Sequence, residues 1–322
     1  MSETLINVNN LTKIFQSRMH KQPLIAVNDV TIDIKKGHTV GLVGESGSGK
    51  STIGRCLLRL IEIDNGEIIF EGQRLDKLKK DDFRKKMRSR MQMVFQDPYD
   101  SLNPRKKIKN IVLEPIRLAG KMNGRDPDLV AGELLEKVRL NPSLINSYRH
   151  QLTPGQQQCV GIARAIATNP DFIVLDEPTS LLDVSVRMNV LQILADLQKT
   201  LGITYLFISH DLSTVQVICH DVAVMYLGKI IETGTVNQVF NTPRHPYSKA
   251  LLSSVLLPDP SKKHLSCELK GEIPSPLDMP SGCPLHTRCP SAVPECIHSK
   301  QQMQDIGEGH IVACMRVVNG EI

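Results

Sequence analysis

The sequence predicts an α/β fold in which helices cover both faces of a parallel sheet. Two short apolar runs, residues 172–175 and 204–208, are separated by a stretch with the hydrophobic period of an amphipathic helix. Continuous apolar strands that alternate with helices are typical of parallel sheets, because both faces of such a sheet are buried. A third apolar run, residues 40–43, leads into a glycine-rich loop and a predicted helix over residues 52–60.

The remaining segments differ in character along the chain. The first ninety residues alternate short β-rich runs with turns, and residues 66–72 form a predicted strand bounded by glycines. Residues 97–165 show helical periodicity, as in the spacing of Leu129, Leu134 and Val138. From about residue 257 the chain is rich in Pro and Cys and has little periodicity. We therefore expect a main domain over 1–255, with a helical part at about 97–165, and a C-terminal region over 256–322.

Composition limits the possible function classes. The 322 residues carry a mild formal net charge of +5, and aromatic residues make up 4% with no Trp. Stacking platforms for single-stranded nucleic acid are therefore not expected. No apolar run approaches the ~20 residues that span a bilayer, and the first residues lack the order of a secretory signal. We expect a cytoplasmic protein whose membrane role, if any, comes through partners.

The glycine-rich loop at residues 44–51 matches the full P-loop pattern and has the strand before it and the helix after it that this motif requires. Its glycines allow successive N–H groups to point at phosphate oxygens. Lys50 is expected to reach the β- and γ-phosphates, and Ser51 to hold Mg²⁺. The expected nucleotide contacts are Gly44, Ser46, Gly47, Ser48, Gly49, Lys50, Ser51 and Thr52.

Two carboxylates follow the apolar run at 172–175. Asp176 and Glu177 are expected at the carboxyl edge of the sheet, where ligands of such folds bind. Asp176 is expected to orient Mg²⁺, and Glu177 to orient or deprotonate the attacking water. Alone, such a pair is often a solvated strand end. Together with the P-loop, it predicts hydrolysis.

Single polar residues follow two other predicted strands. His210 comes just after residues 204–208 and is a candidate contact for the γ-phosphate, and Gln96 comes after a short run at 93–95. Neither is informative in isolation.

Taken in order, six motifs resemble the nucleotide-binding subunits of ABC transporters, and the match covers nearly the first 250 residues. These motifs are 44–51, Gln96, 152–156, the pair Asp176 and Glu177, Asp183, and His210. The resemblance implies a P-loop NTPase core with an N-terminal antiparallel β-subdomain, an inserted helical subdomain and a small Cys-rich C-terminal region. It also implies ATP and Mg²⁺ as ligands and an ABC-type transport ATPase activity.

The resemblance further implies roles for individual residues. Phe15 is expected to stack on adenine, Gln96 to contact Mg²⁺ and couple the γ-phosphate to membrane subunits, and Asp183 to cross the interface of an ATPase pair. Residues of the signature loop, Thr153, Gly155 and Gln156, would contact the ATP held by the second subunit. Lys50, Glu177 and His210 are the expected catalytic residues.

A narrower resemblance is to the ATPases of dipeptide, oligopeptide and nickel importers, and it rests on residues 96–105, 243–247 and 271–276. It implies a peripheral protein at the cytoplasmic face of the membrane, with a second and different ATPase chain, two transmembrane permease subunits and an extracytoplasmic solute-binding protein. Nickel or another solute stays open as cargo. A soluble ABC-type ATPase that acts on nucleic acid or ribosomes is the competing class. The sequence lacks the coiled-coil insertions or second P-loop domain of such proteins, so no nucleic-acid partner is expected.

The signature loop departs from the family's Leu-Ser-Gly-Gly-Gln. Thr153 replaces Ser, Pro154 replaces Gly, and Cys159 stands where a basic residue is usual. Proline removes an N–H and fixes φ. The alternatives are a tolerated variant and a weakened second ATP site. In the second case, the productive ATP site would combine this chain's complete P-loop and Glu177 with the signature loop of the partner.

Four cysteines cluster near the end of the chain, at Cys283, Cys289, Cys296 and Cys314. Four thiolates suit tetrahedral zinc or an iron–sulfur cluster, and reduced cysteines without metal stay open. The narrower resemblance implies a 4Fe–4S cluster with a structural role.

Overall fold

The computed structural model describes residues 3–16, 23–253 and 268–322, which form two compact units. The first unit contains 34–39 and 69–209, together with the first residues of the chain. The second contains 7–33, 40–68 and 210–322. The predicted domain boundary at residue 256 falls outside the described residues and stays a prediction. Among the described residues, no helix is both long and apolar enough to cross a membrane.

A run of parallel strands forms the centre of the first unit. Strand β7 (Phe172–Asp176) pairs in parallel with β6 (Met91–Val94) on one side and β8 (Thr204–Ile208) on the other. Every residue of β7 and β8 is buried, as expected for apolar strands covered on both faces. The two strands predicted from apolar runs are therefore confirmed.

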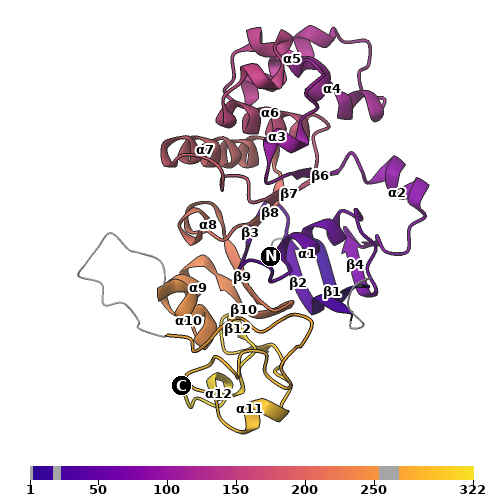
Figure 1. The fold of residues 1–322 in the computed structure, drawn as a ribbon. Helices are drawn as coiled ribbons and strands as arrows, with labels where there is room; N and C mark the ends of the chain where they lie inside the picture. Colours follow the sequence, from indigo (N-terminus) through magenta and orange to yellow (C-terminus); the bar gives the residue numbers. More distant parts are fainter. Residues whose placement is uncertain (1–2, 17–22, 254–267) are drawn as a thin grey trace. The chain divides into compact units, whose positions relative to one another are not determined.

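The helices of the first unit begin at clear start signals. Asp97, Asp126 and Thr153 cap α3, α5 and α6 with side-chain oxygens that accept backbone N–H groups, and a proline follows each cap. Helices α3 to α6 pack against one another in the region where helical periodicity predicted them (Figure 1). The helices are α2 (Lys80–Lys86), α3 (Pro98–Ser101), α4 (Ile108–Leu118), α5 (Pro127–Lys137), α6 (Pro154–Ile166) and α7 (Val184–Leu201), with 3₁₀ turns at Pro142–Asn146 and Arg149–Gln151.

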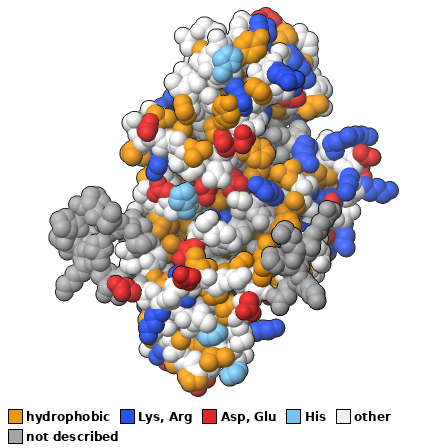
Figure 2. All heavy atoms as spheres, viewed as in Figure 1, with side chains coloured by type: hydrophobic (Ala, Val, Ile, Leu, Met, Phe, Trp, Pro, Cys, Tyr) orange, Lys and Arg blue, Asp and Glu red, His pale blue; other side chains and the backbone are white. Residues whose placement is uncertain are grey.

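Lys and Arg side chains surround helix α2. Figure 2 shows them gathered at the edge of the molecule where Figure 1 places this helix. Only Phe83 of the helix is buried, and Asp81 lies in its first turn with basic residues in its last, which complements the helix dipole. Arg84, Lys85 and Lys86 thus lie on the exposed side of a short helix.

The second unit has its own run of strands, in the order β11-β12-β10-β9-β3. Strand β3 (Thr39–Val43) pairs in parallel with β9 (Asp221–Tyr226), while β10 (Lys229–Thr235) pairs antiparallel with β9. The short strands β12 (Ile311–Val312) and β11 (Gln304–Asp305) then extend this edge. The helices of this unit are α1 (Lys50–Leu57), α8 (Leu212–Ile218), α9 (Val236–Asn241), α10 (Pro246–Ser253), α11 (Glu295–His298) and α12 (Met315–Val318).

A separate four-stranded sheet is built from the N-terminal strands. Its order is β2-β1-β4-β5, and its strands are β1 (Thr4–Phe15), β2 (Leu24–Lys35), β4 (Asn65–Phe70) and β5 (Gln73–Arg74). Strand β4 ends before the predicted residue 72, because Glu71 (φ 46°) and Gly72 (φ 76°) form the turn to antiparallel β5. Helix α1 likewise differs from its predicted range of 52–60. It starts at Lys50, directly after left-handed Gly49, and is over before Arg59, whose φ is 47°.

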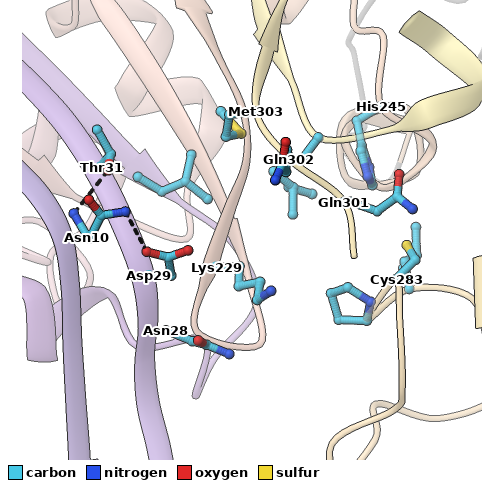
Figure 3. Close-up of a pocket in the computed structure, with 15 residues that line it drawn as sticks. Asn10, Asn28, Asp29, Thr31, Lys229, His245, Cys283, Gln301, Gln302 and Met303 are labelled. Carbon is cyan, nitrogen blue, oxygen red and sulfur yellow. Dashed lines mark hydrogen bonds between the residues drawn. The ribbon is translucent and has the colours of Figure 1, made fainter. Parts of the chain in front are cut away.

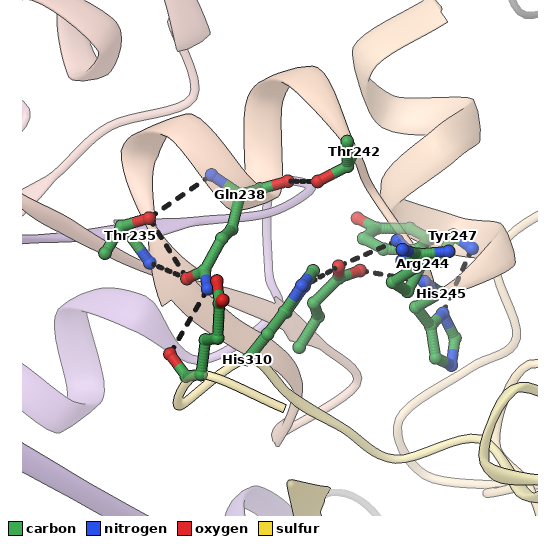
Figure 4. A network of polar contacts seen from close by, with 9 residues as sticks. Thr235, Gln238, Thr242, Arg244, His245, Tyr247 and His310 are labelled. Carbon is green, nitrogen blue, oxygen red and sulfur yellow. Dashed lines mark hydrogen bonds and ion pairs between the residues drawn. The ribbon is translucent and has the colours of Figure 1, made fainter. Parts of the chain in front are cut away.

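A buried carboxylate fixes the C-terminal segments of the second unit to β10. Glu232 is fully buried, and its two oxygens accept the backbone N–H groups of Arg244 (2.8 Å) and His245 (2.9 Å). His310 Nε2 lies 2.7 Å from the same carboxylate. Figure 4 shows these groups converging from three chain segments. Burial alone would raise the pKa of Glu232, but these hydrogen bonds hold it below its ordinary value.

We expect Glu232→Gln to destabilise the protein, because the amide retains the shape but leaves buried donors poorly matched. The expected loss is roughly 3 kcal/mol of unfolding free energy at neutral pH. The folded pKa is lowered, so this stabilisation is fully present above the ordinary Glu value and is lost as pH falls through the folded value. Denaturant titrations of both proteins across acidic and neutral pH measure this. Equal pH dependence in the two proteins would contradict it.

Candidate nucleotide-binding site

The P-loop between β3 and α1 curls around the ammonium group of Lys50. Lys50 Nζ donates to the carbonyl oxygens of Gly44 (2.9 Å) and Glu45 (2.8 Å), and lies 3.4 Å from Ser48 Oγ. The ammonium is thereby held at the centre of the loop. Such a concave loop, followed by a helix start, is suited to bind phosphate through backbone N–H groups and the Lys50 charge. Ser51 and Thr52 lie in the first turn of α1.

Two glycines of the loop are required by close backbone approach. A Cβ at Gly44 would lie 2.1 Å from the carbonyl oxygen of Met225, and one at Gly49 would lie 2.2 Å from that of Ala26. Both glycines also have positive φ, 149° and 104°. Gly47 has a φ of 79° too, but no atom lies within 4 Å of its Cβ position. The loop conformation is thus fixed by sterics as well as by Lys50.

The carboxylate pair lies at the end of β7. Asp176 is its last residue and is buried, while Glu177 is half-buried. Glu177 has a φ of 47°, and its N–H donates to the carbonyl of Ile208 (2.9 Å). The two carboxylates thus differ in burial and in backbone conformation.

Gln96 and Glu177 meet although 81 positions separate them. Gln96 Nε2 donates to Glu177 Oε2 at 2.9 Å. The contact follows from the register of β6 and β7, in which Val94 pairs with Leu175, so both strands end at the same edge. The amide thus holds the carboxylate of the proposed base, and both side chains remain accessible to a ligand.

The other predicted site residues lie on the exposed surface of their own units. His210 is exposed between β8 and α8, and Asp183 is exposed at the start of α7. Phe15 ends β1 with 37% of its surface exposed, and the ammonium of Lys13 lies 5.4 Å from its ring centroid. Exposure fits an aromatic that stacks on a base.

The altered signature loop forms an intact helix start. Thr153 caps α6 in a capping box, with Gln156 N donating to Thr153 Oγ1 (3.3 Å) and Thr153 N donating to Gln156 Oε1 (3.0 Å). Pro154 occupies the first helical position, where proline is favoured. A Cβ at Gly155 would lie 2.5 Å from Val186. Cys159 is buried, and burial raises the pKa of its thiol to about 11. It acts there as a small core residue.

Four cysteines surround one small cavity in the second unit. Cys283, Cys289, Cys296 and Cys314 all line a space of about 20 Å³, and none of these four described residues forms a disulfide. Burial and then the neighbouring thiols raise the pKa of Cys283 to about 11. Within the described residues, no group of three or more His, Cys, Asp or Glu side chains is close enough to hold a single metal ion. The four side chains therefore share the lining of one cavity.

A larger cavity of about 330 Å³ lies beside the cysteines and is lined by none of residues 44–51. Figure 3 shows Asn10 hydrogen-bonded to Asp29 and Thr31 on one side of it, with Cys283 and His245 on the other. It is distinct from the phosphate loop.

Sequence reasoning missed two residues that contact the P-loop. Tyr247 and Arg288 both hydrogen-bond to Glu45, the second residue of the loop. In the sequence, residues 243–247 were noted only for their resemblance to peptide and nickel importers. Cys289, which follows Arg288, was noted only as a member of the four-cysteine cluster.

The loop geometry, the Asp176–Glu177 pair and the parallel strands define a nucleotide-hydrolysing ATPase of the ABC class. Solved structures agree with this class. The chain superposes with a TM-score of 0.66 on a post-hydrolysis dimer of the ATP-binding cassette MJ0796 with ADP and phosphate, at 28% identity over 72% of this chain and 99% of that one. For cbiO1 of Clostridium perfringens, part of an ABC transporter complex, the TM-score is 0.63 at 26% identity, and the match covers 74% of this chain and 92% of that one.

Sequence comparisons narrow the class. Residues 27–180 match the ABC transporter family model, and residues 231–296 match that of the oligopeptide/dipeptide transporter C-terminal region. A putative peptide import ATP-binding protein of Brucella ovis is 46% identical over 98% of this chain and 99% of its own length. A putative oligopeptide transport ATP-binding protein of Bacillus subtilis, YkfD, is 47% identical over 97% of each chain. The chain therefore belongs to the ABC transporter ATP-binding proteins of the oligopeptide/dipeptide type.

Proposed function

We propose that the chain is the ATP-hydrolysing subunit that powers import of di- or oligopeptides through partner membrane subunits. The observation that carries this is the whole-chain similarity to peptide import ATP-binding proteins, which includes both the ABC region and the specific C-terminal region. ATP hydrolysis is the energy source, and residues 97–165 form the helical subdomain inserted in the ATPase domain.

The roles proposed for ATP hydrolysis fall on the P-loop and on residues at or after the ends of β6, β7 and β8. Lys50 and the loop N–H groups would bind the β- and γ-phosphates, and Ser51, Gln96 and Asp176 would hold Mg²⁺ or its waters. Glu177 would orient or deprotonate the attacking water, and the amide of Gln96 donates to that carboxylate (2.9 Å). His210 would contact the γ-phosphate, and Phe15 would stack on the adenine. When bound, Mg²⁺ would supply positive charge to the phosphates.

A second ATPase subunit is supported by apolar side chains exposed beside Asp183. Leu181 (60%), Val184 (73%) and Met188 (48%) are exposed around the first turn of α7, which contacts the signature helix α6. We propose that this surface pairs with a different ATPase chain. Gly155 and Gln156 face that chain's ATP, and Pro154 offers no N–H there, so the ATP site served by this chain's signature is the weaker one.

Two exposed aromatics flank Gln96 and support docking of the permease subunits. Phe95 (39% exposed) and Tyr99 (55% exposed) lie on either side of it, and the Arg149 guanidinium packs 3.7 Å from the Tyr99 ring centroid. A permease loop seated here would sense the γ-phosphate through Gln96. The protein then sits at the cytoplasmic face of the membrane, and an extracytoplasmic binding protein delivers the cargo.

We also propose that the Cys-rich C-terminal region holds a 4Fe–4S cluster on Cys283, Cys289, Cys296 and Cys314. The support is that four thiols line one cavity, and four cysteine thiolates are the ligand set that a 4Fe–4S cluster would need. Bound iron and inorganic sulfide in anaerobically purified protein, with broad visible absorbance, would support this. Colourless protein that contains zinc would refute it.

The import function is tested in the assembled transporter. The tagged chain, purified gently from its native membranes, is expected to bring a second ATPase, two permeases and a binding protein. In proteoliposomes, a di- or oligopeptide bound to that binding protein is expected to stimulate ATP hydrolysis. Stimulation of ATP hydrolysis by Ni²⁺ but not by peptides would mean that the cargo is nickel and not a peptide. If the tagged chain is purified with ribosomal or DNA-bound partners alone, the import function is refuted.

A further inference from the structure

Two side chains from the last quarter of the chain hold Glu45 of the P-loop. Tyr247 accepts the backbone N–H of Glu45 at its hydroxyl (3.0 Å). The guanidinium of Arg288 donates through Nη1 to both carboxylate oxygens of Glu45 (3.1 and 3.4 Å) and through Nη2 to one of them (3.4 Å). The main chain of this one residue is therefore fixed by Tyr247, and its side chain by Arg288 of the C-terminal region.

The holding groups are themselves immobilised. Tyr226 and Tyr247 are fully buried, with ring centroids 4.7 Å apart, and Arg288 Nη1 lies 3.4 Å from the Tyr226 hydroxyl. Arg288 is 8% exposed. Burial lowers the pKa of its guanidinium, but the contacts with Tyr226 and Glu45 raise it above the ordinary value. A planar, permanently charged fork in this packing specifies one position for the carboxylate.

Glu45 transmits this position to Lys50. The Glu45 carbonyl accepts from Lys50 Nζ (2.8 Å) and from the backbone N–H of Ser48 (3.2 Å). A displaced Glu45 would move the carbonyl that aims the ammonium at phosphate. We propose that Arg288 is a positioning residue for nucleotide binding, through which the C-terminal region sets the shape of the P-loop.

The segment that carries Arg288 also carries one of the clustered cysteines. The N–H groups of Arg288 (2.9 Å) and Cys289 (2.8 Å) both donate to the carbonyl of Leu285. Cys289 and Cys283, at the two ends of this turn, line the four-cysteine cavity. Arg288, which contacts Glu45, and Cys289, which lines the cavity, are therefore adjacent residues of one short turn.

Charge gives a way to separate positioning from neutralisation. If Arg288 only neutralised Glu45, Glu45→Gln would remove a negative charge near the phosphates and bind ATP as well as the wild type or better. If the contact positions the loop, Glu45→Gln weakens binding despite the lost charge. Glu45→Gln is therefore the decisive variant, because electrostatics alone would predict that it strengthens ATP binding.

The test measures the Kd of MgATP by calorimetry on the full-length chain. We expect Arg288→Gln and Glu45→Gln each to raise Kd roughly tenfold, since a charge-assisted contact of this kind is lost in both. The double variant should be no worse than Arg288→Gln, and Arg288→Lys should recover part of the affinity. The matched control is Arg316→Gln, which breaks another C-terminal ion pair, that with Glu321 (2.8 Å), and should leave Kd unchanged.

Thermal unfolding of the same variants separates this role from a loss of folding. The positioning role predicts weaker ATP binding at an unfolding temperature matched to that of Arg316→Gln. Wild-type or tighter MgATP binding by Glu45→Gln overturns the proposal, as does an equal loss of affinity in the Arg316→Gln control.

Discussion

Glu177→Gln in the assembled complex is expected to lower ATP turnover at least ~100-fold while MgATP still binds, as for loss of a general base. The amide keeps the size of the side chain but cannot accept a proton from water. It can still hydrogen-bond with Gln96, whose Nε2 lies 2.9 Å from the Glu177 carboxylate. The measurement is steady-state phosphate release with the partner ATPase unmodified.

The same variant tests the proposed inequality of the two ATP sites. In the proposed mechanism, Glu177 acts on the ATP held by this chain's own P-loop, and the partner's signature completes that site. If this site is the productive one, the corresponding substitution in the partner ATPase should be much milder. Nearly unchanged turnover in Glu177→Gln would place the productive site elsewhere and would refute the hypothesis. Its matched control is Glu136→Gln, the same substitution at an exposed position of α5.

The strands that carry the site could be predicted from sequence because burial leaves a strong local signal. Residues 204–208 form β8 with the predicted bounds, and every one of them is buried. Parallel pairing of such strands then implies that residues after their carboxyl ends share an edge. The contact between Gln96 and Glu177 is a consequence of that rule, although neither residue was informative alone.

The signature loop shows how the position of a proline in a helix decides its local effect. In the sequence, Pro154 left two alternatives open, a tolerated variant and a weakened second ATP site, because proline removes an N–H. In the structure it stands at the first position of α6, where an N–H has no helical partner in any case. The helix start is therefore undisturbed, and what remains of the hypothesis concerns only a missing donor to the partner's ATP.

The contacts of Glu45 could not have been found from sequence. Glu45 and Arg288 are 243 positions apart, and no periodicity or spacing links a P-loop residue to Arg288, which lies outside the helices and strands of this region. Such a pair depends on how the C-terminal segments pack against β10, which is itself decided by buried polar groups such as Glu232 and His310 (2.7 Å). Long-range polar packing leaves no local pattern to detect.

Gly49→Ala is expected to unfold the P-loop, while Gly47→Ala is expected to be mild. Both glycines have positive φ, 104° and 79°, so both substitutions carry the backbone strain of about 1 kcal/mol that a Cβ adds there. Only at Gly49 would the Cβ also lie 2.2 Å from a carbonyl oxygen, that of Ala26. Because this obstacle is backbone, it cannot rotate away. We expect Gly49→Ala to cost at least ~3 kcal/mol of unfolding free energy, as overpacking and strain combine.

The comparison is made by denaturant unfolding without nucleotide, so that any direct contact with phosphate does not contribute. A difference of about 2 kcal/mol between the two variants would assign the cost to the approach of Ala26, since the strain from φ is common to both. MgATP binding should be lost in Gly49→Ala, because a shift of the loop at this point moves Lys50, the next residue, away from the Gly44 and Glu45 carbonyls that hold it (2.9 and 2.8 Å). Equal stabilities would mean that β2 yields to the added methyl group, and that the P-loop tolerates more movement than its packing implies.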